Sequence, residues 1–156
     1  MDLRKAFFEI MCELAERDEK VILITGDLGF NFYEEYASRF PKQFLNAGCI
    51  EQSMISIASG MAKAGLKPYV YSGAIFLLCR ANEQIRDDIC YNNLNVKLIG
   101  TSSSGFLGFT HNFYFEKEEN YLKGLPNIQY LEARNEERLK IALKLLTSRE
   151  SLFIKL

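Results

Sequence analysis

The amino-acid sequence predicts an α/β fold, in which a mostly parallel open sheet carries helices on both of its faces. Two observations lead to this prediction. Short apolar segments alternate along the chain with segments of helical periodicity. The run Val21-Ile-Leu-Ile is apolar at every position, which is typical of a strand buried on both faces. Strands that alternate with helices favour parallel pairing through helical crossovers.

The expected elements follow one another along the whole chain. Strands are predicted over residues 20–25, 43–47, 69–71, 96–100, 127–131 and 152–156, and helices over 2–17, 32–39, 51–64, 75–91 and 135–147. Asp2 is the expected cap of the first helix, and Gly65 ends the third. The turn over residues 26–29 follows the first strand, at the strand end where open α/β sheets place their ligands.

Length and composition indicate an ordinary globular domain. A chain of 156 residues with 48% hydrophobic residues is long enough to bury a core, so a single domain over residues 1–156 is expected. The net charge is −1 and acids and bases are interspersed, without the basic clustering of nucleic-acid-binding proteins. No apolar run has the length of a membrane span, and the first residues do not resemble a signal peptide. A cytoplasmic location is therefore expected.

The four cysteines fit no metal-binding or redox spacing, and we expect reduced, mostly buried thiols. They are Cys12, Cys49, Cys79 and Cys90. The chain contains one histidine, His111, so a zinc site made from its own His and Cys residues is not expected. No metal ligand is predicted in this chain.

Glu51 is the most informative acid, because it stands where the second strand turns into a helix. A carboxylate in a first helical turn is stabilised by the helix dipole, and this alone explains many such acids. The neighbours of Glu51 are apolar or small, which indicates a carboxylate half-buried at an interface and favours a functional role.

The segment Asn46-Ala-Gly-Cys-Ile-Glu-Gln-Ser-Met, with the small-residue helix that follows, resembles the pyrimidine-binding module of thiamine-diphosphate enzymes of the transketolase and deoxyxylulose-phosphate-synthase group. The resemblance extends from about Asp2 to the end of the chain and implies a flavodoxin-like three-layer fold. It identifies Glu51 with the catalytic glutamate of the family, which exchanges a proton with the pyrimidine ring of the cofactor.

A second motif, from Tyr71 to Arg86, is similar to the family segment whose phenylalanine stacks on the pyrimidine ring. Counting forward from Glu51 identifies this residue as Phe76, whereas counting back from Gln84 identifies it as Leu77. The discrepancy indicates a one-residue insertion, and Phe76 is preferred because an aromatic face gives better ring contact. Arg80 matches a family arginine that fixes this segment or contacts the cofactor; a surface pair with Glu83 would explain it equally well.

Two further segments carry the resemblance. Gly108-Phe-Thr-His-Asn resembles the family loop whose histidine contacts the substrate, and this implies that His111 transfers protons in the active centre. Asp27 and Leu28 resemble a family segment that lies at the dimer interface beside the cofactor. The aromatic-rich residues 106–122 are expected either to cover a ligand or partner or to pack within the chain.

The departures from the family are equally informative. Phe106 and Leu107 stand where transketolases carry an acid that binds a sugar hydroxyl, and the second histidine near Gly100 is absent. The Gly-Asp-Gly motif that holds the diphosphate and Mg²⁺ in this family is also missing. The resemblance therefore implies half of an enzyme, in which a separately encoded subunit supplies the diphosphate and Mg²⁺ contacts. A homodimeric core within a heterotetramer is expected.

The predicted function is that of the pyrimidine-binding subunit of a split transketolase-like enzyme, which transfers a two-carbon ketol unit. A decarboxylating synthase of the deoxyxylulose-phosphate type, to which this chain would contribute a subunit, is an alternative, as is a non-catalytic regulatory or assembly subunit. A plain flavodoxin-like binding domain fits less well, because the sequence lacks a glycine-rich phosphate loop. The sequence does not indicate the donor or acceptor substrate.

Overall fold

Six strands form one parallel sheet in the computed structural model, which describes residues 2–101, 118–145 and 151–156. The strands are β1 (Val21–Thr25), β2 (Phe44–Asn46), β3 (Lys67–Gly73), β4 (Lys97–Thr101), β5 (Ile128–Glu132) and β6 (Ser151–Lys155). Their order across the sheet is β2-β1-β3-β4-β6-β5, and each of these neighbouring pairs is parallel. The predicted fold class is confirmed.

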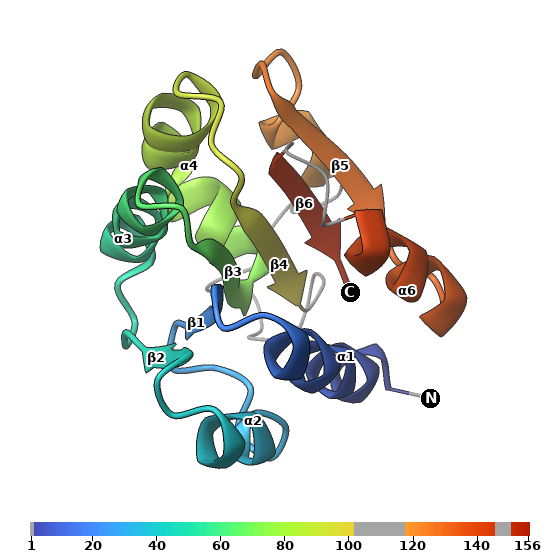
Figure 1. Ribbon diagram of the computed structural model, residues 1–156. Coiled ribbons are helices and arrows are strands. Elements are labelled where there is room, and N and C mark those ends of the chain that lie inside the picture. The colour runs from blue at the N-terminus through green and yellow to red at the C-terminus, as the bar shows by residue number, and fades with distance from the viewer. Residues whose placement is uncertain (1, 102–117, 146–150) are drawn as a thin grey trace.

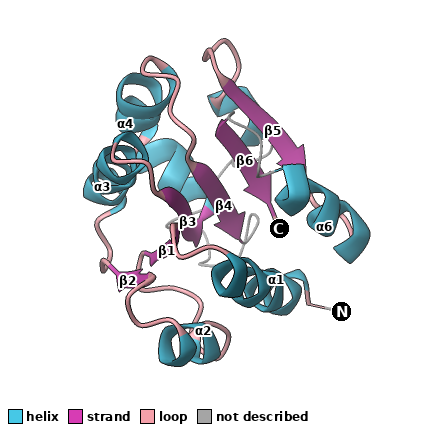
Figure 2. Ribbon diagram, viewed as in Figure 1, coloured by secondary structure: helices cyan, strands magenta, loops and turns pink. Residues whose placement is uncertain are grey.

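Helices cover both faces of this sheet. The α-helices are α1 (Leu3–Arg17), α2 (Glu34–Arg39), α3 (Glu51–Lys63), α4 (Asn82–Gln84) and α6 (Glu136–Leu145). Two π-helical segments, η1 (Phe76–Arg80) and η2 (Ile85–Cys90), flank α4, and a 3₁₀ turn, η3 (Glu118–Tyr121), precedes β5. Figure 1 shows α1 and α6 on one side of the sheet and α3 and α4 on the other. The three layers can be followed in Figure 2, where the strands are magenta between cyan helices.

Side-chain alternation along the strands builds a separate core on each face. In β1, Val21 and Leu23 pack with α1, whereas Ile22 and Ile24 pack with α3. Successive side chains of a strand point to opposite faces, so a strand that is apolar at every position serves both cores. The run Val21–Ile24 of β1 is therefore apolar at every position because its side chains contribute to the cores on both faces of the sheet.

The strand β3 is longer than the predicted 69–71 at both ends, and its first residues include Pro68. Proline cannot donate a hydrogen bond to a neighbouring strand and is tolerated mainly near the start of a strand. Pro68 lies opposite Ile22 of β1, whereas the pairing with β4 begins only at Tyr69. The proline therefore lies at the strand end that is paired on one side only.

The helix predicted over residues 75–91 is not continuous. The chain forms two π-helical segments and a short α-helical turn, with an irregular residue at Ala81 (φ −112°, ψ 20°). A π-helical turn holds more residues than an α-helical turn and often occurs at functional sites. The π-helical segment η1 can therefore accommodate the one-residue insertion that the motif spacing indicates between Glu51 and Gln84.

The cysteines divide evenly, so the prediction of mostly buried thiols holds for only two of the four. Cys12 and Cys90 are buried, whereas Cys49 and Cys79 are exposed. Burial raises the pKa of the Cys90 thiol to about 11. Cys49 lies in the connection that precedes α3, and Cys79 belongs to η1. Among the helices of the described residues, none is long and apolar enough to cross a membrane.

Candidate functional site

Glu51 is the first residue of α3 and is almost completely buried, with 3% of its surface exposed. The carboxylate Oε1 accepts a hydrogen bond from Ser72 Oγ at 3.2 Å, and Oε2 lies 3.2 Å from Arg80 Nη1. The positive end of the helix dipole also favours an anion at this position. Glu51 is thus more buried than the half-buried acid that was predicted, and both of its oxygens have partners.

Ser72 reaches Glu51 because of the alternation of side chains along β3. Tyr69 and Tyr71 belong to the core on the α1 side, whereas Val70 belongs to the core on the α3 side. Ser72 continues the second set and is fully buried. Sequence reasoning assigned no role to Ser72. Its place at the carboxyl end of a buried strand, two residues after Val70, was the signal that could have identified it.

Phe76 and Arg80 complete the surroundings of Glu51. The Arg80 Cζ atom lies 4.3 Å from the centroid of the Phe76 ring, and the same guanidinium group forms the ion pair with Glu51. Arg80 thus pairs with Glu51, not with Glu83 as the surface alternative supposed. Leu77 is completely buried in the core on the α3 side. Phe76 is only partly buried, and its ring contacts the same guanidinium group that pairs with Glu51.

Two glycines allow this close arrangement. A Cβ atom added at Gly73 would lie 3.0 Å from Phe76 Cδ2. One added at Gly26 would lie 3.2 Å from Ser72 Oγ and 3.3 Å from Met54 Sδ. Contacts at these distances force neighbouring atoms to shift, so glycine at both positions lets β1, β3 and α3 converge around the carboxylate.

Asp27 and Leu28 lie in the turn that follows β1, directly after Gly26. Asp27 is exposed and has a positive φ of 56°. Its N–H donates to Asn46 Oδ1 at 3.1 Å, and Asn46 Nδ2 donates to the Asp27 carboxylate at 3.2 Å. The N–H of Leu28 donates to Thr25 Oγ1 at 3.3 Å, and its side chain packs against the core on the α1 side. The structure therefore brings Glu51, Phe76 and Arg80 together, whereas these contacts of Asp27 and Leu28 are with neighbouring segments.

The segment η3 packs against η1 and so links the site to β5. Asn82 Nδ2 donates to the Tyr121 carbonyl oxygen at 3.2 Å. A hydrogen bond with the Cys79 thiol raises the pKa of the Tyr121 phenol. Of the aromatic rings predicted to cover a ligand or partner, only Tyr121 falls within the described residues. His111, the other predicted catalytic residue, also lies outside them.

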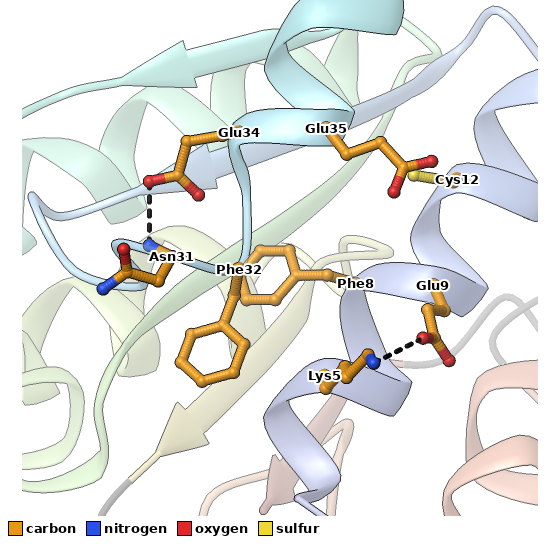
Figure 3. A pocket seen from close by; sticks show the side chains of 8 residues that line it. All are labelled: Lys5, Phe8, Glu9, Cys12, Asn31, Phe32, Glu34 and Glu35. Carbon is orange, nitrogen blue, oxygen red and sulfur yellow. Dashed lines mark hydrogen bonds and ion pairs between the residues drawn. The ribbon is translucent and has the colours of Figure 1, made fainter.

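The described residues contain no group of three or more His, Cys, Asp or Glu side chains that could hold a metal ion. They do form a groove of about 370 Å³ between α1 and residues 31–35 (Figure 3). Phe8 and Phe32 are stacked in it, and Glu34 accepts a hydrogen bond from the Asn31 N–H at 2.8 Å. None of the predicted site residues lines this groove.

Comparison with known proteins connects this geometry to a family. The family described as the transketolase pyrimidine-binding domain matches residues 1–154. An apulose-4-phosphate transketolase subunit of Phocaeicola vulgatus is 36% identical over 112 residues, which are 69% of this chain and 36% of that protein. The 1-deoxy-D-xylulose-5-phosphate synthase of Clostridium tetani is 32% identical over 154 residues, 94% of this chain and 24% of that protein.

Solved structures share the fold. A split gene transketolase, described as an inactive beta4 tetramer, superimposes with a TM-score of 0.85 and 28% identity over 97% of this chain and 50% of that chain. The transketolase of Campylobacter jejuni superimposes with a TM-score of 0.84 at 19% identity, over 97% of this chain and 25% of that one. The chain thus spans about a third or less of the two relatives compared by sequence. It belongs to the transketolase pyrimidine-binding domain family.

Proposed function

We propose that residues 1–156 act as the pyrimidine-binding part of a split, thiamine-diphosphate-dependent transketolase-like enzyme that transfers a two-carbon ketol unit. The observation that carries this proposal is the buried Glu51 carboxylate, which pairs with the same guanidinium group that lies over the partly exposed Phe76 ring. A buried acid and an aromatic face are what a flat ring with a hydrogen-bonding nitrogen requires. Family membership supports the same cofactor.

The described residues fit the aminopyrimidine ring of that cofactor. The guanidinium of Arg80 is itself a flat group with an N–C–N edge, and it contacts both Phe76 and Glu51. A group that lies over the Phe76 ring can therefore also bond to Glu51. When bound, thiamine diphosphate supplies the reactive thiazolium carbon.

Each residue of the site has a stated task in this proposal. Glu51 holds and exchanges a proton at its carboxyl oxygens, and the apolar surroundings of α3 keep water away from that proton. Ser72 orients the carboxyl group through its hydrogen bond to Oε1. Phe76 binds the ring by stacking.

The other predicted residues keep their proposed roles. Asp27 and Leu28 lie at a subunit interface beside the bound cofactor. His111 transfers protons to or from the substrate. Arg80 takes part in cofactor binding, through the position of its guanidinium group relative to Phe76. These roles rest on the resemblance described above.

The proposed partner is a separately encoded subunit that holds the diphosphate and supplies most of the Mg²⁺ contacts. Similarity to a protein named as a transketolase subunit and to a split gene transketolase supports this proposal. We further propose a homodimeric core within a heterotetramer, located in the cytoplasm, with a sugar or 2-oxo compound as the small-molecule substrate.

A decarboxylating synthase of the deoxyxylulose-phosphate type is a second candidate. It is favoured by the Clostridium tetani synthase, which matches 94% of the chain, a larger share than the 69% matched by the apulose-4-phosphate transketolase relative. The two candidates differ in their donor: a ketose phosphate for ketol transfer, and a 2-oxo acid that releases carbon dioxide for the synthase. Release of carbon dioxide by the assembled enzyme distinguishes them.

Calorimetry of thiamine diphosphate binding with Mg²⁺ tests the proposal. We expect weak binding by this chain alone and tight binding in a mixture with the protein encoded beside it that carries a Gly-Asp-Gly motif, because the diphosphate contributes most of the affinity. Glu51→Gln should then bind the cofactor but lack turnover. Absence of binding in the mixture would contradict the proposal and leave a non-catalytic assembly subunit as the better interpretation.

A further inference from the structure

The guanidinium group of Arg80 lies between the two side chains that the proposed function assigns to the cofactor ring. Its Cζ atom is 4.3 Å from the centroid of the Phe76 ring, well within the distance of a cation–π contact. Its Nη1 atom is 3.2 Å from Glu51 Oε2. Arg80 therefore contacts the stacking ring and the acid through one flat group.

An aminopyrimidine that performs the proposed function has to make the same two contacts. It must stack on Phe76 and present a ring nitrogen to Glu51. In this structure the guanidinium group of Arg80 makes both of these contacts. Gly73 lies against the Phe76 ring as well, since a Cβ there would be 3.0 Å from Cδ2. A pyrimidine ring that stacked on the same face of Phe76 and bonded to Glu51 would overlap the guanidinium group, so this bound position and the observed position of Arg80 exclude each other.

Arg80 is placed so that it can leave this position. Its side chain is 47% exposed, in contrast to the 3% exposure of Glu51. It belongs to the π-helical segment η1, at the residue directly before the irregular Ala81. Glu51 keeps its hydrogen bond from Ser72 when the guanidinium departs. The buried acid is therefore not left without a partner in either state.

We propose that Arg80 is an internal placeholder for the cofactor ring: its guanidinium occupies the ring position on Phe76 and Glu51 in the empty chain, and the arriving aminopyrimidine displaces it toward solvent. This inference rests on the proposed function, because it takes the ring position from Phe76 and Glu51. It adds that, in the empty chain, the guanidinium group of Arg80 makes the contacts with Phe76 and Glu51 that the ring would make, and so competes with it. Because ring binding has to displace Arg80, the apparent affinity for the ring is lowered.

The probe for this proposal is 4-amino-5-hydroxymethyl-2-methylpyrimidine, which carries the six-membered ring without the diphosphate. Its affinity is measured by NMR titration of this chain and of Arg80→Ala. Removing the guanidinium abolishes one cation–π contact and one partly exposed ion pair, so we expect about 5- to 10-fold tighter binding by Arg80→Ala. Arg86→Ala is the matched control, because it removes the same charge from an arginine that pairs with Asp87. It should bind the probe like the wild-type chain.

A second readout follows the guanidinium itself. In the empty wild-type chain, nuclear Overhauser contacts are expected between the Phe76 ring protons and the side-chain protons of Arg80, because the two groups are in contact. Saturation with the aminopyrimidine should remove them and replace them with contacts between Phe76 and the probe. If the Phe76–Arg80 contacts persist when the probe is bound, the placeholder proposal is wrong.

The outcomes also separate this inference from the proposed function. Equal or weaker binding by Arg80→Ala, together with loss of binding in Phe76→Ala and weakened binding of the bare ring in Glu51→Gln, would overturn the placeholder but keep the ring site. Binding that is insensitive to all three substitutions, or absent from both wild type and Arg80→Ala at millimolar probe, would overturn the ring site and the placeholder together. Tighter binding by Arg80→Ala, abolished by adding Phe76→Ala, is the result that both proposals require.

Discussion

Two buried glutamates with the same exposure have very different surroundings. Glu51 and Glu118 are each 3% exposed, and each forms an ion pair with a basic side chain. The partner of Glu118 is Lys155 at the end of β6, 2.7 Å away and 18% exposed. The partner of Glu51 is Arg80, 3.2 Å away and 47% exposed.

The difference separates a structural ion pair from a site with an exchangeable partner. The Glu118–Lys155 pair is short, and Lys155 is anchored in a strand that pairs on both sides with β4 and β5. Breaking such a pair leaves a charge in a poorly hydrated place. Glu51 keeps a second partner, Ser72, and its cation can reach water. Burial of an acid is therefore not enough to identify a functional group; the exposure of its partner also matters.

The largest expected effect follows from Glu51→Gln. Glutamine keeps the shape of the side chain and still accepts the hydrogen bond from Ser72, but it has no proton to exchange. We expect turnover of the enzyme assembled with its diphosphate-binding partner to fall by roughly 10²- to 10⁴-fold. The free energy of unfolding should change by less than about 1 kcal/mol, because the unpaired Arg80 is half-exposed. Steady-state kinetics and urea unfolding measure the two quantities.

Glu118→Gln should produce the opposite result. It leaves Lys155 without its carboxylate, so we expect a loss of roughly 3 kcal/mol in the free energy of unfolding, measured by urea denaturation followed by circular dichroism. Binding of the aminopyrimidine probe should be unchanged in the folded protein. Adding Lys155→Met should recover part of the stability, because the uncompensated charge is then gone. Equal destabilisation by the two glutamine variants would erase the distinction between the two acids.

Ser72→Ala tests the second partner of Glu51 and should have an intermediate effect. It removes a hydrogen bond to a buried carboxylate, so we expect a loss of about 1.5 kcal/mol in the free energy of unfolding. Ser59→Ala is the matched control, since Ser59 is also buried but donates to the Ile55 carbonyl within α3, at 2.9 Å. That variant should lose about 0.5 kcal/mol or less. Chemical denaturation measures the free energy of unfolding of both variants. Equal losses of stability would mean that the hydrogen bond from Ser72 to Glu51 contributes no more than an ordinary buried hydrogen bond.

The smallest effect is expected for a partly exposed ion pair, Asp18 with Lys67 at 2.5 Å. The hydrogen bond from Lys67 holds the pKa of Asp18 below its ordinary value of 3.8. A lowered folded-state pKa stabilises the fold above pH 3.8 and loses this contribution as the pH falls through the folded pKa. Asp18→Asn should therefore cost less than about 1 kcal/mol at neutral pH. The difference from wild type should shrink below pH 3.8 in urea titrations, and a difference that is constant with pH would contradict the assignment.

Local patterns in the sequence determined most of the fold and part of the site. The apolar runs and helical spacings predicted six strands of a mostly parallel sheet and their covering helices, because burial on one or two faces imposes a period on the side chains. Glu51 was predicted at the start of α3 for the same reason. Phe76 and Arg80 came from the resemblance of their segment to a known family, and the structure brings both to Glu51.

Only the tertiary structure decided what these residues contact. The hydrogen bond of Ser72 to Glu51 and the ion pair of Arg80 with Glu51 join groups 21 and 29 residues apart in the chain. No local periodicity encodes such distances, because they arise where β3 and α3 converge around Gly26 and Gly73. The sequence by itself thus determined which residues are buried in strands and helices. Packing of the sheet against α3 and η1 decided that one buried acid pairs with a half-exposed arginine and the other with a more buried lysine.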